Sequence, residues 1–277
     1  MRGPTSGPPF AGFASQGFLW LLLVITLTAL FLAINAVQIT SAGTGQRLLR
    51  RAVAPLTDLD TQLPSIHREL HEQAETNTAS DTVSVPTFPI PIGIEKTRAA
   101  TISQEELRAV ILAESARQIY AEGMDVLAGL DPEAQRDTDF ISTAGAIDRG
   151  LGLITEGNHN RILIAAVVLG LISAALTVLL FARLRSYGRL LAAGVLILAA
   201  SLPALAAVVA LRFGFRTAQD DAHRFVNDML RLGIDALELP IRNYISLAVL
   251  GAALLALGFV QMLVATRATT TTLSANK

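Results

Sequence analysis

The stretch ILIAAVVLGLISAALTVLLFA, which runs from Ile162 to Ala182, contains no charged residue and no histidine. A helix rises about 1.5 Å per residue, so roughly 20 apolar residues cross a bilayer core about 30 Å thick. Three other blocks share this character: Phe18–Ile39, Leu190–Leu211 and Tyr244–Thr266. One such block fits the buried helix of a large soluble core, but four in one chain predict four transmembrane helices.

The composition agrees with this prediction. The chain is 52% hydrophobic and 16% charged, and its charged residues gather between the four blocks. It has no cysteine, which excludes a disulfide framework, a thiolate metal site and a cysteine nucleophile.

Basic residues predict the orientation of the spans, because arginine and lysine in short loops resist translocation. Residues 183–189 carry three arginines and no acid, and the two tails carry Arg2, Arg267 and Lys277. The loop 40–160 holds 18 acidic and 10 basic side chains, a net charge of −8. We therefore expect both termini in the cytoplasm and the acidic loop outside.

The first block also permits a second interpretation. Small residues at Ser41–Gly43 fit the cleavage site of a signal peptide, which would leave three spans. The apolar run is longer than the roughly 7–15 residues of a signal sequence, which favours an uncleaved anchor.

The predicted fold class is an all-α membrane protein: a four-transmembrane-helix bundle with a helical extracytoplasmic domain between spans 1 and 2. The predicted segments are a disordered cytoplasmic tail 1–17, spans 18–39, 162–182, 190–211 and 244–266, the extracytoplasmic domain 40–161, a cytoplasmic loop 183–189, a second extracytoplasmic helical loop 212–243 and a cytoplasmic tail 267–277.

The extracytoplasmic domain opens with a helical stripe of apolar residues. Positions alternate in steps of three and four, as in a coiled coil, at Leu49, Ala52, Leu56, Leu59, Leu63, Ile66 and Leu70. Pro55 and Pro64 interrupt the stripe, because each lacks a backbone donor and clashes one turn back. We expect shorter helices, one of which begins near Pro64.

Residues Val83–Ile94 are apolar but hold three prolines, which favours an extended strap over a helix. Three interpretations remain open: a strap packed over the outer helices, a loop that dips into the outer leaflet, or a partner-binding edge. In the last case the contact residues would be Val85, Phe88, Ile90 and Ile92.

Helix ends are also marked further along the chain. Ser103 and Glu106 have the spacing of a capping box, which predicts a helix from there to about Leu127. Asp131 followed by Pro132 indicates a further helix start, and Thr217 with Asp220 another.

Small residues recur at four-residue spacing in the spans, which favours close helix packing in lipid. The predicted packing positions are Ala166, Gly170 and Ala174 in the second span and Ala248, Ala252 and Ala256 in the fourth. The high alanine content of the chain is the simpler explanation for the same pattern.

The spans contain no charged residue, whereas proton relays, ion-coupled transporters and voltage sensors usually need ionisable groups there. Their amides are Asn35, Gln38 and Gln261. We expect Asn35 and Gln38 to meet interfacial water, and Gln261 to hydrogen-bond a neighbouring helix.

One weak metal-site candidate is present. His67 and His71 share a helical face, and with Glu75 they resemble a divalent-cation site. No dedicated third ligand accompanies them, so a solvated helix face is the favoured interpretation. No nucleophile elbow or glycine-rich phosphate loop occurs, and we predict no catalytic residue and no cofactor.

The leading functional hypothesis is a non-enzymatic membrane protein that acts through helix-mediated assembly or through partner binding by its extracytoplasmic domain. The expected partners are membrane lipid and either another copy or another membrane or extracytoplasmic protein; the acidic exterior disfavours nucleic acid. The alternatives are a subunit of an oligomeric channel or transporter, with Asn35, Thr26, Thr28 or Gln261 lining the pore, and a ligand sensor that signals through a partner. The expected location is the bacterial inner or plasma membrane, because 20 of the 22 basic residues are arginine, which is typical of GC-rich genes.

Overall fold

The structure is a computed structural model that describes residues 10–76, 80–123, 126, 150–184, 186–219 and 224–274. The chain divides into two compact units. We call Met1–Asn35, Ile162–Leu211 and Glu238–Lys277 the membrane unit, and Ala36–Arg161 with Arg212–Leu237 the head unit.

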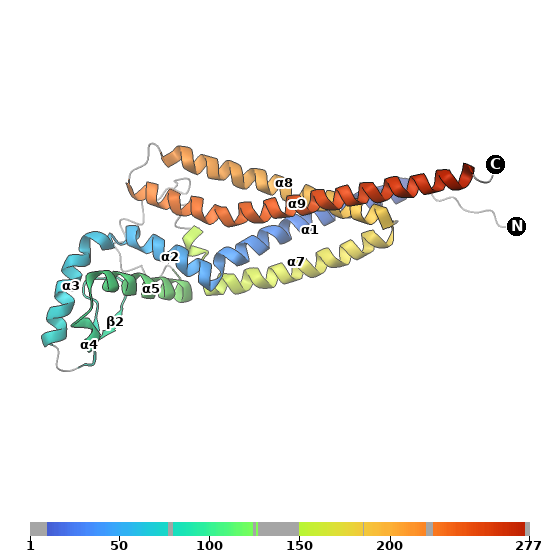
Figure 1. Ribbon diagram of the computed structural model, residues 1–277. Coiled ribbons are helices and arrows are strands. Elements are labelled where there is room, and N and C mark those ends of the chain that lie inside the picture. The colour runs from blue at the N-terminus through green and yellow to red at the C-terminus, as the bar shows by residue number, and fades with distance from the viewer. Residues whose placement is uncertain are drawn as a thin grey trace. The chain divides into compact units, whose positions relative to one another are not determined.

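Four long helices carry the apolar blocks (Figure 1). They are α1 (Phe10–Thr40), α7 (Glu156–Ala182), α8 (Ser186–Gln219) and α9 (Arg224–Ser274). Each contains a segment long and apolar enough to cross a bilayer, namely 17–40, 156–182, 188–219 and 226–266. The predicted fold class is confirmed, and the four segments indicate a multi-pass membrane protein.

The helices extend past the predicted ends of the spans. Helix α1 begins at Phe10, inside the segment expected to be disordered, and α9 continues to Ser274. Helix α8 continues through Thr217, whose hydroxyl donates to the Phe213 and Gly214 carbonyls of its own helix. Thr217 is therefore an interior residue and not a cap, while Asp220 lies outside the described residues.

Helices α8 and α9 approach each other at glycines. A Cβ built on Gly194 would lie 2.7 Å from the carbonyl oxygen of Gly251 and 2.8 Å from the backbone nitrogen of Leu255. A Cβ on Gly258 would lie 2.9 Å from the backbone nitrogen of Leu191. Because backbone atoms cannot move aside as side chains do, these positions require glycine for the observed approach.

The predicted small-residue stripe of the fourth span is displaced from this packed face. Ala252 and Ala256 are exposed and Ala248 is half-buried, whereas Gly251 and Gly258 are buried. On α7, Ala174 is exposed, and Ala166 and Gly170 are half-buried. The helices thus pack through glycines one or two positions away, because a missing Cβ permits a closer backbone contact than alanine does.

Large apolar side chains fill the space between the other helices of the membrane unit. Leu23 of α1, Leu180 of α7 and Leu196 of α8 are buried in one cluster, and Trp20 packs against it. Many other large apolar side chains of these helices are exposed, as lipid-facing residues of a bundle would be.

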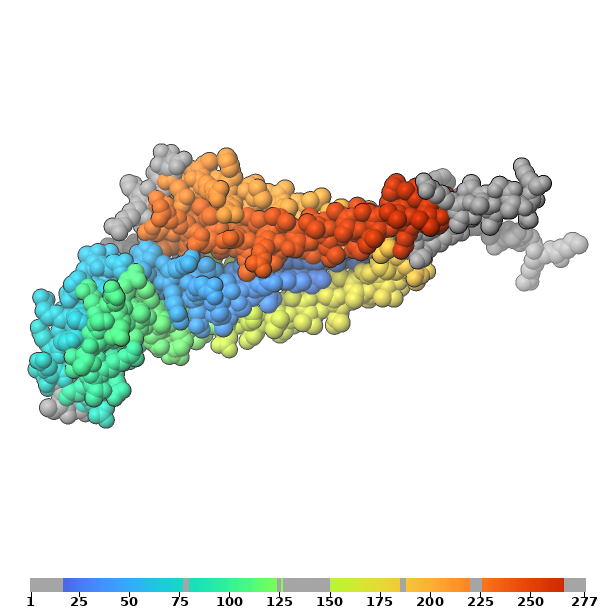
Figure 2. Space-filling view, in the orientation of Figure 1, coloured from blue at the N-terminus to red at the C-terminus, as the bar shows by residue number. Residues whose placement is uncertain are grey.

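The head unit contains short helices and a two-stranded hairpin, together with the adjoining ends of α1, α7, α8 and α9. Its short elements are α2 (Ala42–Leu56), α3 (Leu59–Thr76), β1 (Thr82–Ser84), β2 (Gly93–Glu95), α4 (Lys96–Ala99) and α5 (Gln104–Glu122). The space-filling view shows the atoms of α3, the hairpin and α5 in one continuous mass (Figure 2). The chain breaks at Asp58, whose φ of 46° ends α2, so α3 begins at Leu59 and Pro64 lies inside it.

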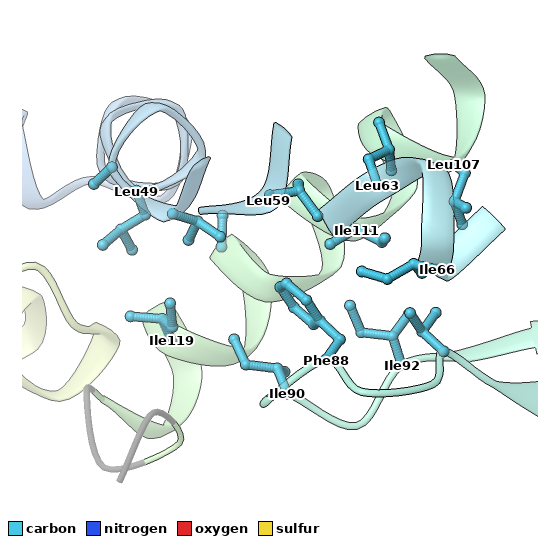
Figure 3. Close-up of a cluster of buried hydrophobic side chains, with 14 of the residues drawn as sticks. Leu49, Leu59, Leu63, Ile66, Phe88, Ile90, Ile92, Leu107, Ile111 and Ile119 are labelled. Atoms are coloured by element: carbon cyan, nitrogen blue, oxygen red, sulfur yellow. The ribbon is translucent and has the colours of Figure 1, made fainter. Parts of the chain in front are cut away.

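The apolar stripe of α2 and α3 forms the core of this unit. Its buried members are Leu49, Ala52, Leu59, Leu63, Ile66 and Leu70, and Leu56 packs against them. Helix α5 covers the stripe with Leu107, Ile111 and Ile119 (Figure 3). The stripe is therefore part of an intramolecular core and not an exposed coiled-coil surface.

The proline-rich strap closes the same core. Strands β1 and β2 pair antiparallel with Val83 opposite Ile94, and the amide of Val85 donates to the Ile92 carbonyl at 2.8 Å. The side chains of Phe88, Ile90 and Ile92 point toward α3 and α5 (Figure 3). Val85, Phe88, Ile90 and Ile92 are 5%, 8%, 0% and 1% exposed, so they form no exposed partner edge.

The capping box of α5 is confirmed. The Ser103 hydroxyl accepts from the Glu106 amide, and the Glu106 carboxylate accepts from the Ser103 amide. The helix ends at Glu122, earlier than the predicted Leu127, because Gly123 takes a φ of 92° that only glycine adopts without strain. The predicted helix start at Asp131 lies outside the described residues, whereas Leu151 and Ile154 are buried in the core.

The glycine contact between α8 and α9 predicts a specific sensitivity. Gly194→Val should lower the free energy of unfolding by about 1–3 kcal/mol, because the added carbons overlap the α9 backbone. Ala252→Val, on the exposed side of α9, should change it by less than about 0.5 kcal/mol. Thermal unfolding in detergent, followed by circular dichroism, measures both variants. Equal effects at the two positions would contradict the close approach.

The strap predicts a second sensitivity. Ile90→Ala should lower the free energy of unfolding of the head unit by about 2–5 kcal/mol, because it empties a fully buried site. Leu153→Ala, at a side chain that is 58% exposed, is the matched control and should have little effect. Urea unfolding in detergent micelles measures the difference. If Ile90→Ala left the free energy of unfolding almost unchanged, this result would contradict the burial of the strap.

Candidate binding groove of the head unit

The head unit contains an open cavity of about 600 Å³, which we call the head groove. Helices α2, α3, α5 and α9 and the turn at Asp58 contribute its charged residues. Its lining residues are Arg51, Ala54, Pro55, Asp58, Asp60, Thr61, Arg108, Asp228, Arg231, Leu232 and Asp235. Seven of these eleven side chains carry a charge, and both signs are present.

The break between α2 and α3 forms one end of the groove. Thr57 closes α2, since its amide and its hydroxyl both donate to the Val53 carbonyl, at 3.0 and 2.8 Å. The carbonyl of Asp58 then accepts from the amides of Thr61 and Gln62, and its carboxylate accepts from the Thr61 hydroxyl at 2.9 Å. Asp58 therefore caps the start of α3 while its other carboxylate oxygen stays available.

Two ion pairs cross the groove. Arg51 Nη1 lies 2.6 Å from Asp235 Oδ2 and joins α2 to α9. Arg108 donates twice to Asp60, from Nε at 2.7 Å and from Nη2 at 3.3 Å, and joins α5 to α3. The hydrogen bonds that Arg108 donates to Asp60 raise the pKa of Arg108, against a smaller opposing effect of burial.

These pairs orient the groove more than they stabilise the fold. The side chains of Arg51 and Asp235 are 58% and 52% exposed, and those of Arg108 and Asp60 are 42% and 63% exposed. Exposed ion pairs contribute about 0–1 kcal/mol each, because water and salt screen them. A ligand can therefore replace either pair at small energetic cost.

Three further charges line the groove: Asp58, Asp228 and Arg231. All three are exposed, and none of them forms an ion pair with another side chain that the structure describes. Leu232 is 8% exposed and belongs to the hydrophobic core of the head unit, so it forms an apolar floor. The groove thus combines spare charges of both signs with a rigid base.

The sequence did not reveal this arrangement. Charges at three- and four-residue spacing along a helix indicate ion pairs only within that helix. Instead Asp235 pairs with Arg51, which is 184 residues away in the chain. Local spacing carries no signal for such a contact.

A second polar cluster fixes the base of the head unit. The Thr40 hydroxyl donates to the Ala36 carbonyl at 2.8 Å, so it must accept from His159 Nδ1 at 3.1 Å. Tyr120 donates to the Thr40 carbonyl at 3.0 Å. Burial, and to a lesser degree Glu156, raise the pKa of Tyr120, which keeps this donor protonated. His159 therefore has a structural partner in Thr40.

The weak metal candidate gains no support. His67 Nε2 donates to the Ile102 carbonyl at 2.9 Å, and His71 Nδ1 donates to the His67 carbonyl at 3.0 Å. The two rings lie 4.3 Å apart, and Glu75 is exposed. Across the described part of the chain, no three histidine or acidic side chains are grouped as a metal site requires.

Three of the polar residues that the sequence singled out in the spans form hydrogen bonds, and a fourth, Gln261, is exposed. Asn35, which is 6% exposed, donates to the Phe31 carbonyl and accepts from Asn243 Nδ2, both at 2.8 Å. It links α1 to α9, the interhelical role that was expected of Gln261. Thr26 and Thr28 donate to carbonyls of their own helix, whereas Gln261 is exposed on α9.

Comparison of the chain with protein-family models, with curated proteins and with solved structures gives no match. The functional argument therefore depends on the groove itself.

Proposed function

We propose that this protein is a non-enzymatic membrane protein whose extracytoplasmic head unit binds a partner or ligand in the head groove. The observation that carries the proposal is the groove lining, in which Arg231, Asp228 and Asp58 remain outside the two crossing ion pairs. Charged side chains at an open surface provide binding and specificity without any need for a nucleophile.

The burial of the apolar residues favours the groove over a hydrophobic surface as the binding site. The Leu49–Leu70 stripe and the strap residues are buried in the core of the head unit. Partner binding through those residues would require the head to unfold. The groove offers a concave surface that is already formed.

The helices that form the groove supply a route by which binding could act on the spans. Arg51 lies on α2, which is separated from α1 by Ser41 alone. Arg231 and Asp235 lie on α9, a single helix that continues to Ser274. A ligand that separates Arg51 from Asp235 would break a link between α2, which follows the helix of the first span, and α9, which contains the fourth span. Such a change fits a sensor as well as an anchor.

The proposed topology keeps both termini in the cytoplasm of a bacterial cell and the head unit outside. The arginines between the second and third spans and the acidic charge of residues 40–160 support it.

Because the chain has no cysteine, single cysteines report the topology without background. A membrane-impermeant maleimide applied to intact cells should label Thr61→Cys and leave Ser274→Cys unlabelled until the cells are opened. Labelling of Ser274→Cys in intact cells would contradict the proposed topology, because it would place the C-terminus outside. The unsubstituted chain, which offers no thiol, is the control.

The binding role is tested by photocrosslinking in native membranes. A photoreactive residue at Thr61, on the groove, should give an adduct that Arg231→Gln weakens several-fold. The same probe at Glu72, which is exposed on α3 outside the groove lining, should give none. Equal adduct yields at the two positions would contradict the proposal. So would an adduct at Thr61 whose yield does not change in Arg231→Gln. An adduct of twice the chain mass would identify a second copy as the partner.

A channel subunit is the alternative function. One observation favours it: Gln261 is exposed on α9, where an amide in lipid gains from a hydrogen bond with a neighbouring chain. Solute flux through liposomes that is lost on Gln261→Leu, with assembly intact, would favour the channel over the binding role.

A further inference from the structure

We infer that the head groove binds a zwitterionic ligand with the chemistry of a short peptide with free ends, its carboxylate at Arg231 and its ammonium group at Asp228 and Asp58. This inference rests on the proposed function, since it assumes that the groove is the binding surface. It adds the chemical class of the ligand and a role for each charge.

Guanidinium donors for a carboxylate are available on two arginines. Arg231 forms no ion pair among the described side chains, and Arg51 contacts Asp235 through Nη1 alone. A guanidinium carries five N–H donors in a planar fork that matches a carboxylate, so both arginines retain capacity. Charge-assisted hydrogen bonds of this kind are about twice as strong as neutral ones.

Acceptors for an ammonium group are available as well. Asp58 uses Oδ1 for the Thr61 hydroxyl and keeps Oδ2, and Asp228 is exposed on α9, three residues before Arg231. Residues three apart on a helix lie side by side, so the spare charges of opposite sign on α9 are neighbours. The net charge of −8 over residues 40–160 also attracts a positive group to this unit.

The mixture of signs excludes simpler ligands. A purely anionic ligand at Arg231 would face the carboxylates of Asp58 and Asp228, which form no ion pair among the described side chains. A purely cationic ligand at those carboxylates would face Arg231. A ligand with one charge of each sign satisfies all three, and like-charge contacts reject the others.

Size and floor favour a peptide over a free amino acid. The groove volume of about 600 Å³ lies within the range of about 300–1,000 Å³ that is typical of ligand sites. This volume is larger than one free amino acid fills. Ala54, Pro55 and Leu232 supply apolar contacts between the charged positions. Small peptide side chains can cover these residues while the two ends reach the charges.

The test uses the full-length protein in lipid nanodiscs and isothermal titration with trialanine. Three matched probes remove one or both charges: N-acetyl-trialanine, trialanine amide and N-acetyl-trialanine amide. Trialanine should bind about tenfold more tightly than either singly capped peptide, since each cap deletes one charge-assisted contact. Free alanine is a fifth probe and should bind more weakly than trialanine.

Groove variants assign each end of the ligand. Arg231→Gln should weaken trialanine to the affinity of its amide while N-acetyl-trialanine amide stays unchanged. The double substitution Asp58→Asn with Asp228→Asn should weaken trialanine to the affinity of its N-acetyl form. Arg68→Gln and Glu72→Gln, exposed on α3 outside the groove lining, are matched controls and should leave binding unchanged. An unchanged thermal midpoint shows that each variant is folded.

Equal affinity for all four trialanine probes, or no trialanine binding at millimolar concentration, would overturn the ligand class. Tighter binding of alanine than of trialanine would keep the zwitterion and overturn the peptide. If the crosslink from Thr61 persists while every peptide fails, the binding function stands and only its ligand class falls. If both fail, the groove is not a binding site.

Discussion

A bilayer core offers no hydrogen-bond partner to a backbone, and this constraint determines the membrane unit. Each span must satisfy its own amides and carbonyls as a helix, and α1, α7, α8 and α9 do so. Hydrophobicity does not draw such helices together, because lipid is as apolar as leucine. The observed contacts include close packing at Gly194, Gly251 and Gly258, the cluster of Leu23, Leu180 and Leu196, and the Asn35–Asn243 hydrogen bond.

The head unit obeys the opposite rule, because water drives its apolar residues into a core. The stripe of α2 and α3 and the strap from Val83 to Ile94 meet in that core, with α5 across them. Burial of these groups leaves charged side chains at the surface. The two ion pairs hold them around the head groove without much effect on stability.

The proposed role of the groove depends on the helices that form it. Arg51 belongs to the helix that follows α1, and Arg231 and Asp235 belong to α9. Binding in the groove would bear on helices that contain spans, so a ligand sensor and a partner-binding anchor are versions of one mechanism. The junction of Thr40, Tyr120 and His159 gives the head unit a fixed base for either role.

The sequence by itself determined the four spans, the capping box at Ser103 and the extended strap, because each depends on composition or on local spacing. Only the tertiary structure decided which surfaces are free. Apolar periodicity shows that Leu49–Leu70 is one face, but the face is identical whether α5 or a second chain covers it. Likewise, alanine spacing predicted a packed stripe, whereas the backbones of α8 and α9 approach each other at glycines. Arg51 pairs with Asp235, which lies 184 residues further along the chain. Contacts between distant residues depend on how the helices pack, and no pattern along the chain records that.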